Sequence, residues 1–220
     1  MSMYPIISIV GKSESGKTTL LEGLIALLKR RGHRVAIIKH SGEDFEFDKT
    51  GKDSWRFSRA GSNVAAIIST HKLAIIRQIE HDPNPQELSH FIAWDCDIVL
   101  TEGFKHNNFP KIEVHRKEQG PDLVSTPEQL LAVVTDEPLA VDVPQFSRNE
   151  VEKITSLIEN TLLAQQKEDD IDLLINDVNT PTSPSFRNLL TKTLIAMVSG
   201  LKGAGQVKNL NISLRRKLDI

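Results

Sequence analysis

The chain contains a single cysteine, Cys96, among its 220 residues. One cysteine cannot form an internal disulfide, and such scarcity is typical of proteins in a reducing cytosol. The longest apolar runs, such as residues 64–68, are far too short to span a bilayer, and no signal peptide is visible before the first expected strand. The net charge of −2 gives no overall attraction to nucleic acid or anionic lipid. These absences predict a soluble, cytoplasmic protein without a nucleic-acid or membrane partner.

Several signatures that would narrow the function are also missing. The seven histidines show no metal-ligand spacing, and the Asn-Lys-x-Asp tetrapeptide that is typical of guanine recognition does not occur. Internal repeats and low-complexity tracts are absent too. What is present is an ordinary globular composition, 39% hydrophobic and 25% charged, in a chain long enough for one domain and a small appendage.

The most informative motif is Gly-x-x-x-x-Gly-Lys-Thr at residues 11–18, here called the phosphate loop. It follows the apolar run 6–10 and precedes leucines at helical spacing, which is the context this motif requires. The glycines let successive N–H groups point inward at phosphate, and the helix N-terminus adds positive potential. Lys17 is expected to reach the β- and γ-phosphates and Thr18 to ligate Mg²⁺. The predicted nucleoside triphosphate site comprises Gly11, Ser13, Glu14, Ser15, Gly16, Lys17, Thr18 and Thr19.

Strand and helix patterns alternate along the chain, which predicts an α/β fold with a doubly wound, mainly parallel sheet and helices on both faces. This phosphate-loop domain is expected over residues 1–165, a polar linker over 166–170, and a small α+β appendage of ββαβ type over 171–220. The expected strands of the main domain are 6–10, 35–39, 64–69, 73–76, 97–103, 111–114 and 130–135. Helices are expected from residue 17, over 54–59, over 86–94 and from a capping box at Ser147–Glu150.

A phosphate loop needs a second metal contact, and the strand 97–103 offers an acid at each end. Asp97 begins the strand and Glu102 ends it. The carboxyl ends of parallel strands lie beside the phosphate loop, so Glu102 is the favoured metal ligand and Asp97 the alternative. Lys17 and Glu102 are therefore the expected catalytic groups.

Two other segments follow strands on the expected ligand side of the sheet. In the polar stretch 40–61, Asp48 is a candidate for water-mediated contact with Mg²⁺, and Arg56 for contact with phosphate or an anionic second substrate. The alternative is a solvated loop in which Asp53 caps a short helix. Asp136 ends a late strand, where a carboxylate can accept the N1 and N2 hydrogens of guanine.

With these segments in place, the chain resembles the molybdopterin-guanine dinucleotide biosynthesis protein B (MobB) family. The resemblance is carried by residues 11–20 (GKSESGKTTL), 44–61 (DFEFDKTGKDSWRFSRAG), 97–106 (DIVLTEGFKH) and 132–143 (AVVTDEPLAVDV). The second and third stretches are much more specific than the first. The resemblance covers residues 4–165 and leaves the tail unexplained.

The resemblance implies a homodimeric protein that binds GTP and Mg²⁺ and has weak GTPase activity. It implies work beside a MobA-type guanylyltransferase that attaches GMP to the molybdenum cofactor. By the same resemblance, Gly16, Lys17, Thr18 and Glu102 hold phosphate and metal. Asp48, Asp53 and Arg56 lie in the family's loop motif, and Lys105 is a candidate for phosphate or partner contact.

Slow hydrolysis also agrees with the residues, since no obvious arginine finger or catalytic glutamine lies beside the phosphate loop. A small-molecule kinase is the main alternative, because it shares this loop and a polar acceptor loop. A pure interaction module is a third possibility, with nucleotide setting the conformation and the basic tail docking a partner.

Overall fold

The computed structural model describes residues 5–42, 51–93, 95–163, 171, 173–175, 178–180, 182–201, 210 and 212. The chain divides into two compact units, one comprising Tyr4–Ala164 and the other Met1–Met3 with Gln165–Ile220.

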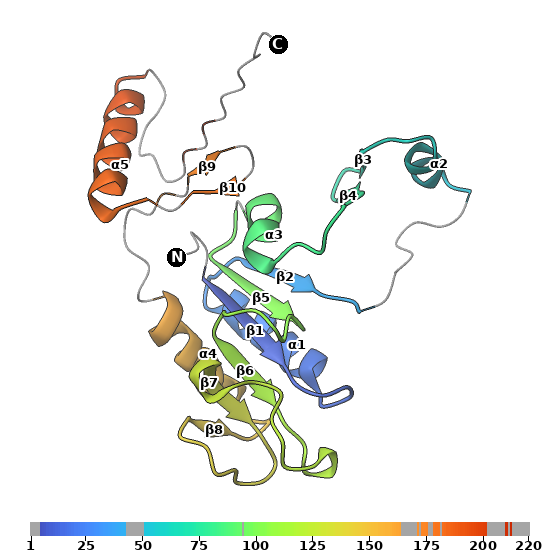
Figure 1. Ribbon diagram of the computed structural model, residues 1–220, viewed down its shortest axis with the longest axis vertical. Helices are drawn as coiled ribbons and strands as arrows, with labels where there is room; N and C mark the ends of the chain where they lie inside the picture. Colours follow the sequence, from blue (N-terminus) through green and yellow to red (C-terminus); the bar gives the residue numbers. More distant parts are fainter. Residues whose placement is uncertain are drawn as a thin grey trace. The chain divides into compact units, whose positions relative to one another are not determined.

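The first unit is built on a six-stranded sheet in which every neighbouring pair is parallel (Figure 1). The strand order is β2-β5-β1-β6-β7-β8, so β1 lies between β5 and β6 although both come much later in the sequence. This confirms the predicted parallel α/β architecture; the short β8 was not predicted. The strands are β1 (Ile6–Val10), β2 (Val35–Lys39), β5 (Ile98–Glu102), β6 (Lys111–Val114), β7 (Leu130–Val134) and β8 (Gln145–Phe146).

Helices cover both faces of the sheet because its strands are apolar on both sides. On one face, α1 (Lys17–Arg30) and α4 (Val151–Ile158) pack on the larger core. On the other, α3 (Pro85–Ile92) contributes to a smaller core around Val99. The side chains of β1 alternate between these cores, with Ile7 in the first and Ile6 in the second. The sheet is thereby held rigidly, with the carboxyl ends of β5, β1 and β6 next to one another.

The predicted strands 64–69 and 73–76 form β3 (Val64–Ile68) and β4 (Leu73–Arg77), but these pair only with each other in the described sheets. Their antiparallel hairpin is contacted by α2 (Asp53–Arg59). A two-stranded sheet is marginally stable alone in water. Its apolar side chains are largely exposed, including Val64, Ile67, Ile68, Leu73 and Ile75.

The capping box predicted at Ser147–Glu150 is only half formed. Glu150 accepts a hydrogen bond from the Ser147 backbone N–H at 2.8 Å, yet α4 begins at Val151 with Glu150 as its N-cap. The predicted helix start is therefore three residues too early. Three further helical turns were not predicted: η1 (Lys117–Gln119), η2 (Pro127–Gln129) and a π-helical turn, η3 (Glu159–Leu163).

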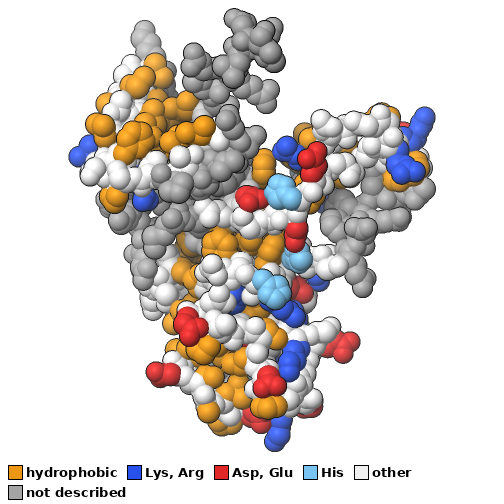
Figure 2. Space-filling view, in the orientation of Figure 1, with side chains coloured by type: hydrophobic (Ala, Val, Ile, Leu, Met, Phe, Trp, Pro, Cys, Tyr) orange, Lys and Arg blue, Asp and Glu red, His pale blue; other side chains and the backbone are white. Residues whose placement is uncertain are grey.

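The second unit contains an antiparallel pair, β9 (Leu174–Ile175) and β10 (Val178–Asn179), followed by α5 (Pro184–Ser199). The last strand of the predicted ββαβ appendage was expected at residues 210–214, where only Leu210 and Ile212 are described, and neither lies in a strand. Figure 2 shows apolar side chains gathered over α5; the exposed ones include Phe186, Leu189, Ile195 and Met197. No described helix is long and apolar enough to cross a membrane.

Candidate functional site

The phosphate loop joins β1 to α1 in a conformation that its glycines permit. Gly11, Glu14 and Gly16 have positive φ angles of 142°, 59° and 97°. A β-carbon on Gly11 would lie 2.3 Å from the Val114 carbonyl oxygen, so no larger residue fits against the end of β6. The loop is thus pressed against the neighbouring strand before α1 begins at Lys17.

The Lys17 ammonium is folded back onto the loop. Its Nζ donates a hydrogen bond to the Lys12 carbonyl oxygen at 2.7 Å. Burial lowers the pKa of Lys17; Glu102 opposes this shift, while the nearby Lys105 and Lys39 add to it. Lys17 therefore lies near two further lysines and one carboxylate, and this excess of positive charge makes this end of the sheet attractive to an anion.

Glu102 ends β5 directly beside the start of α1. Its Oε2 accepts a hydrogen bond from Thr18 Oγ1 at 3.2 Å, and its Oε1 lies 3.3 Å from Lys39 Nζ. The Glu102 side chain is only 14% exposed. A hydroxyl and a carboxylate at this spacing are hard oxygen donors of the kind that Mg²⁺ prefers, so the two residues fit such an ion. The placement agrees with the expectation for the carboxyl end of the strand, and the metal role stays a prediction.

After Glu102 the chain turns sharply through two residues of positive φ, Gly103 at 96° and Phe104 at 55°. A β-carbon on Gly103 would lie 3.3 Å from the Cβ of His40, and the Phe104 ring packs on the His40 ring at 4.8 Å. A left-handed phenylalanine is strained and persists where packing over-determines it. The turn leaves Lys105 exposed and close enough to Lys17 to affect its pKa.

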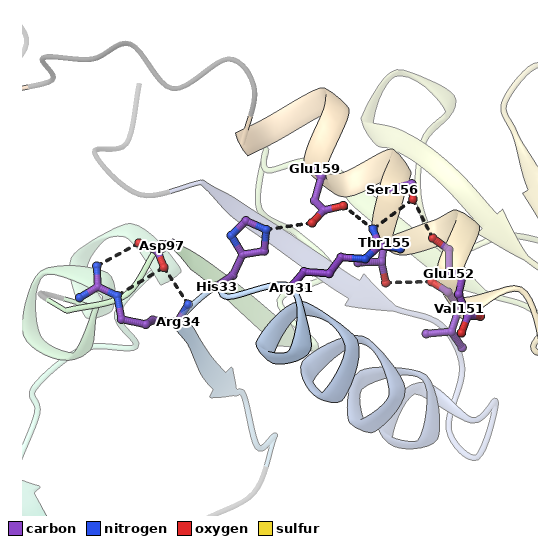
Figure 3. Close-up of polar contacts among 9 residues, drawn as sticks. All are labelled: Arg31, His33, Arg34, Asp97, Val151, Glu152, Thr155, Ser156 and Glu159. Carbon is purple, nitrogen blue, oxygen red and sulfur yellow. Dashed lines mark hydrogen bonds and ion pairs between the residues drawn. The ribbon is translucent and has the colours of Figure 1, made fainter.

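Asp97, the alternative metal ligand, lies at the opposite end of β5 from the phosphate loop, and Figure 3 shows it hydrogen-bonded to Arg34. Its Oδ2 accepts a hydrogen bond from the Arg34 backbone N–H at 2.7 Å, and its Oδ1 accepts one from the Arg34 guanidinium at 3.0 Å. These bonds lower the pKa of Asp97. The carboxylate therefore joins the start of β2 to the start of β5, and it is too far along the strand to be a metal ligand beside the phosphate loop.

The Asp97→Asn substitution is expected to destabilise the protein by about 1 kcal/mol at pH 7, because the charge-assisted hydrogen bonds to Arg34 are lost. The folded-state pKa of Asp97 is lowered, so this stability is complete above the unfolded value of about 3.9 and disappears as the pH falls through the folded value. Thermal unfolding of Asp97→Asn, with exposed Asp142→Asn as control, checks this. An equal difference from wild type at pH 7 and pH 3 would contradict it.

The predicted loop residues that the structure describes do not gather at the phosphate loop. Asp48 lies outside the described residues. Asp53 and Arg56 form an exposed ion pair of 3.7 Å with each other on α2, and among the described residues neither pairs with the phosphate loop. Asp53 is the first residue of α2 and supplies the acid of its first turn, but Lys52 is the N-cap and no described side chain caps the helix, so the capping role of the solvated-loop alternative was wrong. A ligand role for these residues stays a prediction.

Asp136 follows β7 at the carboxyl edge of the sheet, on the other side of β1 from Glu102. Its Oδ1 accepts a hydrogen bond from the Lys117 backbone N–H at 3.2 Å. Burial works to raise the pKa of Asp136, but this bond and the charges of Arg116 and Arg148 hold it below its usual value. Asp136 lines an open pocket of about 440 Å³ with Thr135, Glu137, Pro138, Gln145, Phe146 and Ser147.

Sequence reasoning missed Arg116 and Gln119, which lie against the phosphate loop. Gln119 Nε2 donates to the Ser13 carbonyl oxygen, and Lys12 Nζ donates to the Gln119 carbonyl oxygen at 2.6 Å. Arg116 packs on Gly16. An arginine and a glutamine therefore lie beside the loop, where the sequence showed no obvious arginine finger or catalytic glutamine. The available signal was that both residues closely follow the predicted strand 111–114. Their contact with the phosphate loop could not be predicted, because it depends on β6 lying next to β1 in the sheet.

Comparisons with known proteins place this geometry in a family. The family model described as "Molybdopterin guanine dinucleotide synthesis protein B" matches residues 6–136. A molybdopterin-guanine dinucleotide biosynthesis adapter protein of Haemophilus influenzae is 41% identical, covering 73% of this chain and 91% of its own. A putative molybdopterin-guanine dinucleotide biosynthesis adapter protein of Methanocaldococcus jannaschii is 26% identical over 95% of this chain and 97% of its own length. The crystal structure of Bacillus subtilis MobB has a TM-score of 0.58 at 27% identity, and the match covers 70% of this chain and 98% of the MobB chain.

Proposed function

Because this chain belongs to the family of molybdopterin guanine dinucleotide synthesis protein B, we propose that it is a GTP-binding adapter in synthesis of the guanine dinucleotide form of the molybdenum cofactor, with weak Mg²⁺-dependent GTPase activity. The carrying observation is the grouping of Lys17, Thr18 and Glu102 at the carboxyl edge of a parallel sheet. No feature of the described site favours the small-molecule kinase.

The residues of the site suggest how the triphosphate is held. Lys17 exchanges the Lys12 carbonyl for the β- and γ-phosphate oxygens, a stronger, charge-assisted pairing. Thr18 and Glu102 are placed to hold Mg²⁺, which when bound would offset the charge of the phosphates. Lys39 and Lys105 add positive charge at this end. Hydrolysis is expected to be slow, because the Gln119 amide donates to the Ser13 carbonyl oxygen and supports the loop instead of orienting an attacking water.

Guanine is the base we propose for the open pocket beside Asp136. An exposed carboxylate at the end of β7 can accept the N1 and N2 hydrogens of guanine, whereas adenine offers no matching pair of donors. The hydrogen bond from the Lys117 N–H orients the carboxylate, and each of its oxygens still has a lone pair for a guanine hydrogen.

Titration calorimetry with Mg²⁺, comparing GTP with ATP in the presence and absence of purified molybdenum cofactor, tests the proposal. Preference for GTP together with an effect of the cofactor would support it. Equal or tighter binding of ATP without a cofactor effect would overturn it and reopen the search for a kinase acceptor.

The proposed partners are a MobA-type guanylyltransferase with the molybdenum cofactor and a second copy of this chain in the cytoplasm. The exposed apolar side chains of the β3–β4 hairpin support a homodimer, because a two-stranded sheet gains stability when such a surface is covered.

Removal of residues 166–220 is expected to leave GTP affinity within about twofold of the full chain, since Lys17, Thr18, Glu102 and Asp136 all belong to the unit Tyr4–Ala164. Calorimetry on both proteins checks this expectation. A loss of more than tenfold would mean that the tail completes the site.

A further inference from the structure

The segment that follows β6 is fastened to the phosphate loop at several points. Gly11 fits against the Val114 carbonyl, Gln119 donates to the Ser13 carbonyl, and Lys12 donates to the Gln119 carbonyl. Residues 114–119 therefore support the loop from the β6 side. Any charge carried by this segment acts on the loop at short range.

Arg116 carries such a charge. Its side chain is only 9% exposed, and a β-carbon on Gly16 would lie 2.8 Å from its Nη2. The guanidinium thus occupies the space that a side chain at position 16 would need. The glycine of the Gly-Lys-Thr sequence is required here for close approach of an arginine as well as for its φ of 97°.

The guanidinium is poorly satisfied where it lies. Among the described residues, neither Nη1 nor Nη2 has a hydrogen-bond partner, although both atoms are buried. The Asp136 carboxylate is 3.9 Å from Nη1, an ion-pair distance that is too long for a hydrogen bond. Ser15 Oγ and Gln119 Oε1, on the loop and its support, are also buried without a partner in the described structure. Buried unpaired donors are costly and call for an explanation.

The acids near Arg116 attract it without forming a hydrogen bond to it in the described structure. Asp136 and Glu118 attract it, whereas Arg148 repels it, and burial lowers the pKa of Arg116. Arg116, Asp136 and Arg148 follow the neighbouring strands β6, β7 and β8, so two arginines and one aspartate lie along the same edge. A structural ion pair would include a hydrogen bond to the guanidinium, which neither Asp136 nor Glu118 makes among the described residues.

We propose that Arg116 is a positioning residue for phosphate, whose buried guanidinium holds the loop at Gly16 and supplies positive charge that the phosphate chain of the bound nucleotide neutralises. The inference rests on the proposed nucleotide site and adds a residue to it. Without nucleotide the arginine costs stability; with nucleotide its charge gains the partner it lacks. Arg116 then favours the bound state over the empty one.

Three variants test this role: Arg116→Met, Arg116→Lys, which keeps the charge, and Arg30→Met, an exposed arginine at the far end of α1, as control. Affinities for Mg²⁺ with GTP and with ATP, and unfolding temperatures without nucleotide, are measured for each. Arg116→Met is expected to lower the affinity for both nucleotides about 10- to 100-fold. Its unfolding temperature without nucleotide is expected to equal or exceed that of wild type. Arg116→Lys should recover most of the affinity.

Several outcomes would overturn the proposal. Unchanged affinity in Arg116→Met would remove the phosphate role. A lower unfolding temperature without nucleotide, or failure to fold, would show a structural ion pair. A loss confined to GTP would assign Arg116 to the base pocket through Asp136. The proposed function is tested separately, on the wild-type protein. If the wild type binds neither nucleotide, the proposed function itself is refuted, whatever the Arg116 variants do.

Discussion

Replacing Lys17 with alanine is expected to reduce GTP affinity about 100- to 1000-fold. The wild-type ammonium is partly buried, its pKa is lowered, and its Nζ donates to the Lys12 carbonyl of the loop. On the triphosphate it would gain two charge-assisted hydrogen bonds of about 1.5–3 kcal/mol each, and every 1.4 kcal/mol is tenfold in affinity. Titration calorimetry with Mg²⁺ and GTP measures the loss directly.

The matched control is Lys29→Ala, which removes an exposed lysine from the last turn of the same helix. It is expected to bind GTP as the wild type does. Because the Lys17 ammonium is not required by the core around Leu24 and Leu28, the alanine variant should unfold close to the wild-type temperature. Unchanged affinity in Lys17→Ala would eliminate the phosphate loop as the nucleotide site.

The sheet and the Glu102 side of the site were predictable because they depend on local pattern. An apolar strand, a glycine-rich turn and leucines at helical spacing specify the unit from Ile6 to Arg30. The rule that ligands lie at the carboxyl ends of parallel strands then separates Glu102 from Asp97 on one strand. Both residues follow from sequence and strand direction, without knowledge of which strands are neighbours.

The Arg116 side could not be predicted in this way. Gly16 and Arg116 are 100 positions apart, and they meet only because β6 lies next to β1 in the sheet. A basic residue after a strand has no local feature that distinguishes a solvated side chain from a buried one. The hairpin β3–β4 illustrates the same limit, since its apolar runs resemble sheet strands but pair only with each other in the described part of the chain.

Glu102→Gln is expected to leave Mg²⁺-free GTP binding nearly unchanged and to reduce Mg²⁺-dependent hydrolysis about 100-fold. Gln keeps the size of the side chain and an oxygen for Thr18, but it loses the charge that a divalent ion requires. Turnover measured against Mg²⁺ concentration checks this, with exposed Glu22→Gln as the control.

The substitution also breaks the ion pair with Lys39, so Lys39→Met is needed beside it to separate the two effects. Since the Lys39 side chain is 64% exposed, its ion pair with Glu102 contributes little stability. Lys39→Met should therefore retain the Mg²⁺ dependence that Glu102→Gln loses. Wild-type turnover in Glu102→Gln would refute the metal role, whereas equal losses in both variants would assign the effect to the ion pair. Only a loss specific to Glu102→Gln identifies the carboxylate itself as the ligand.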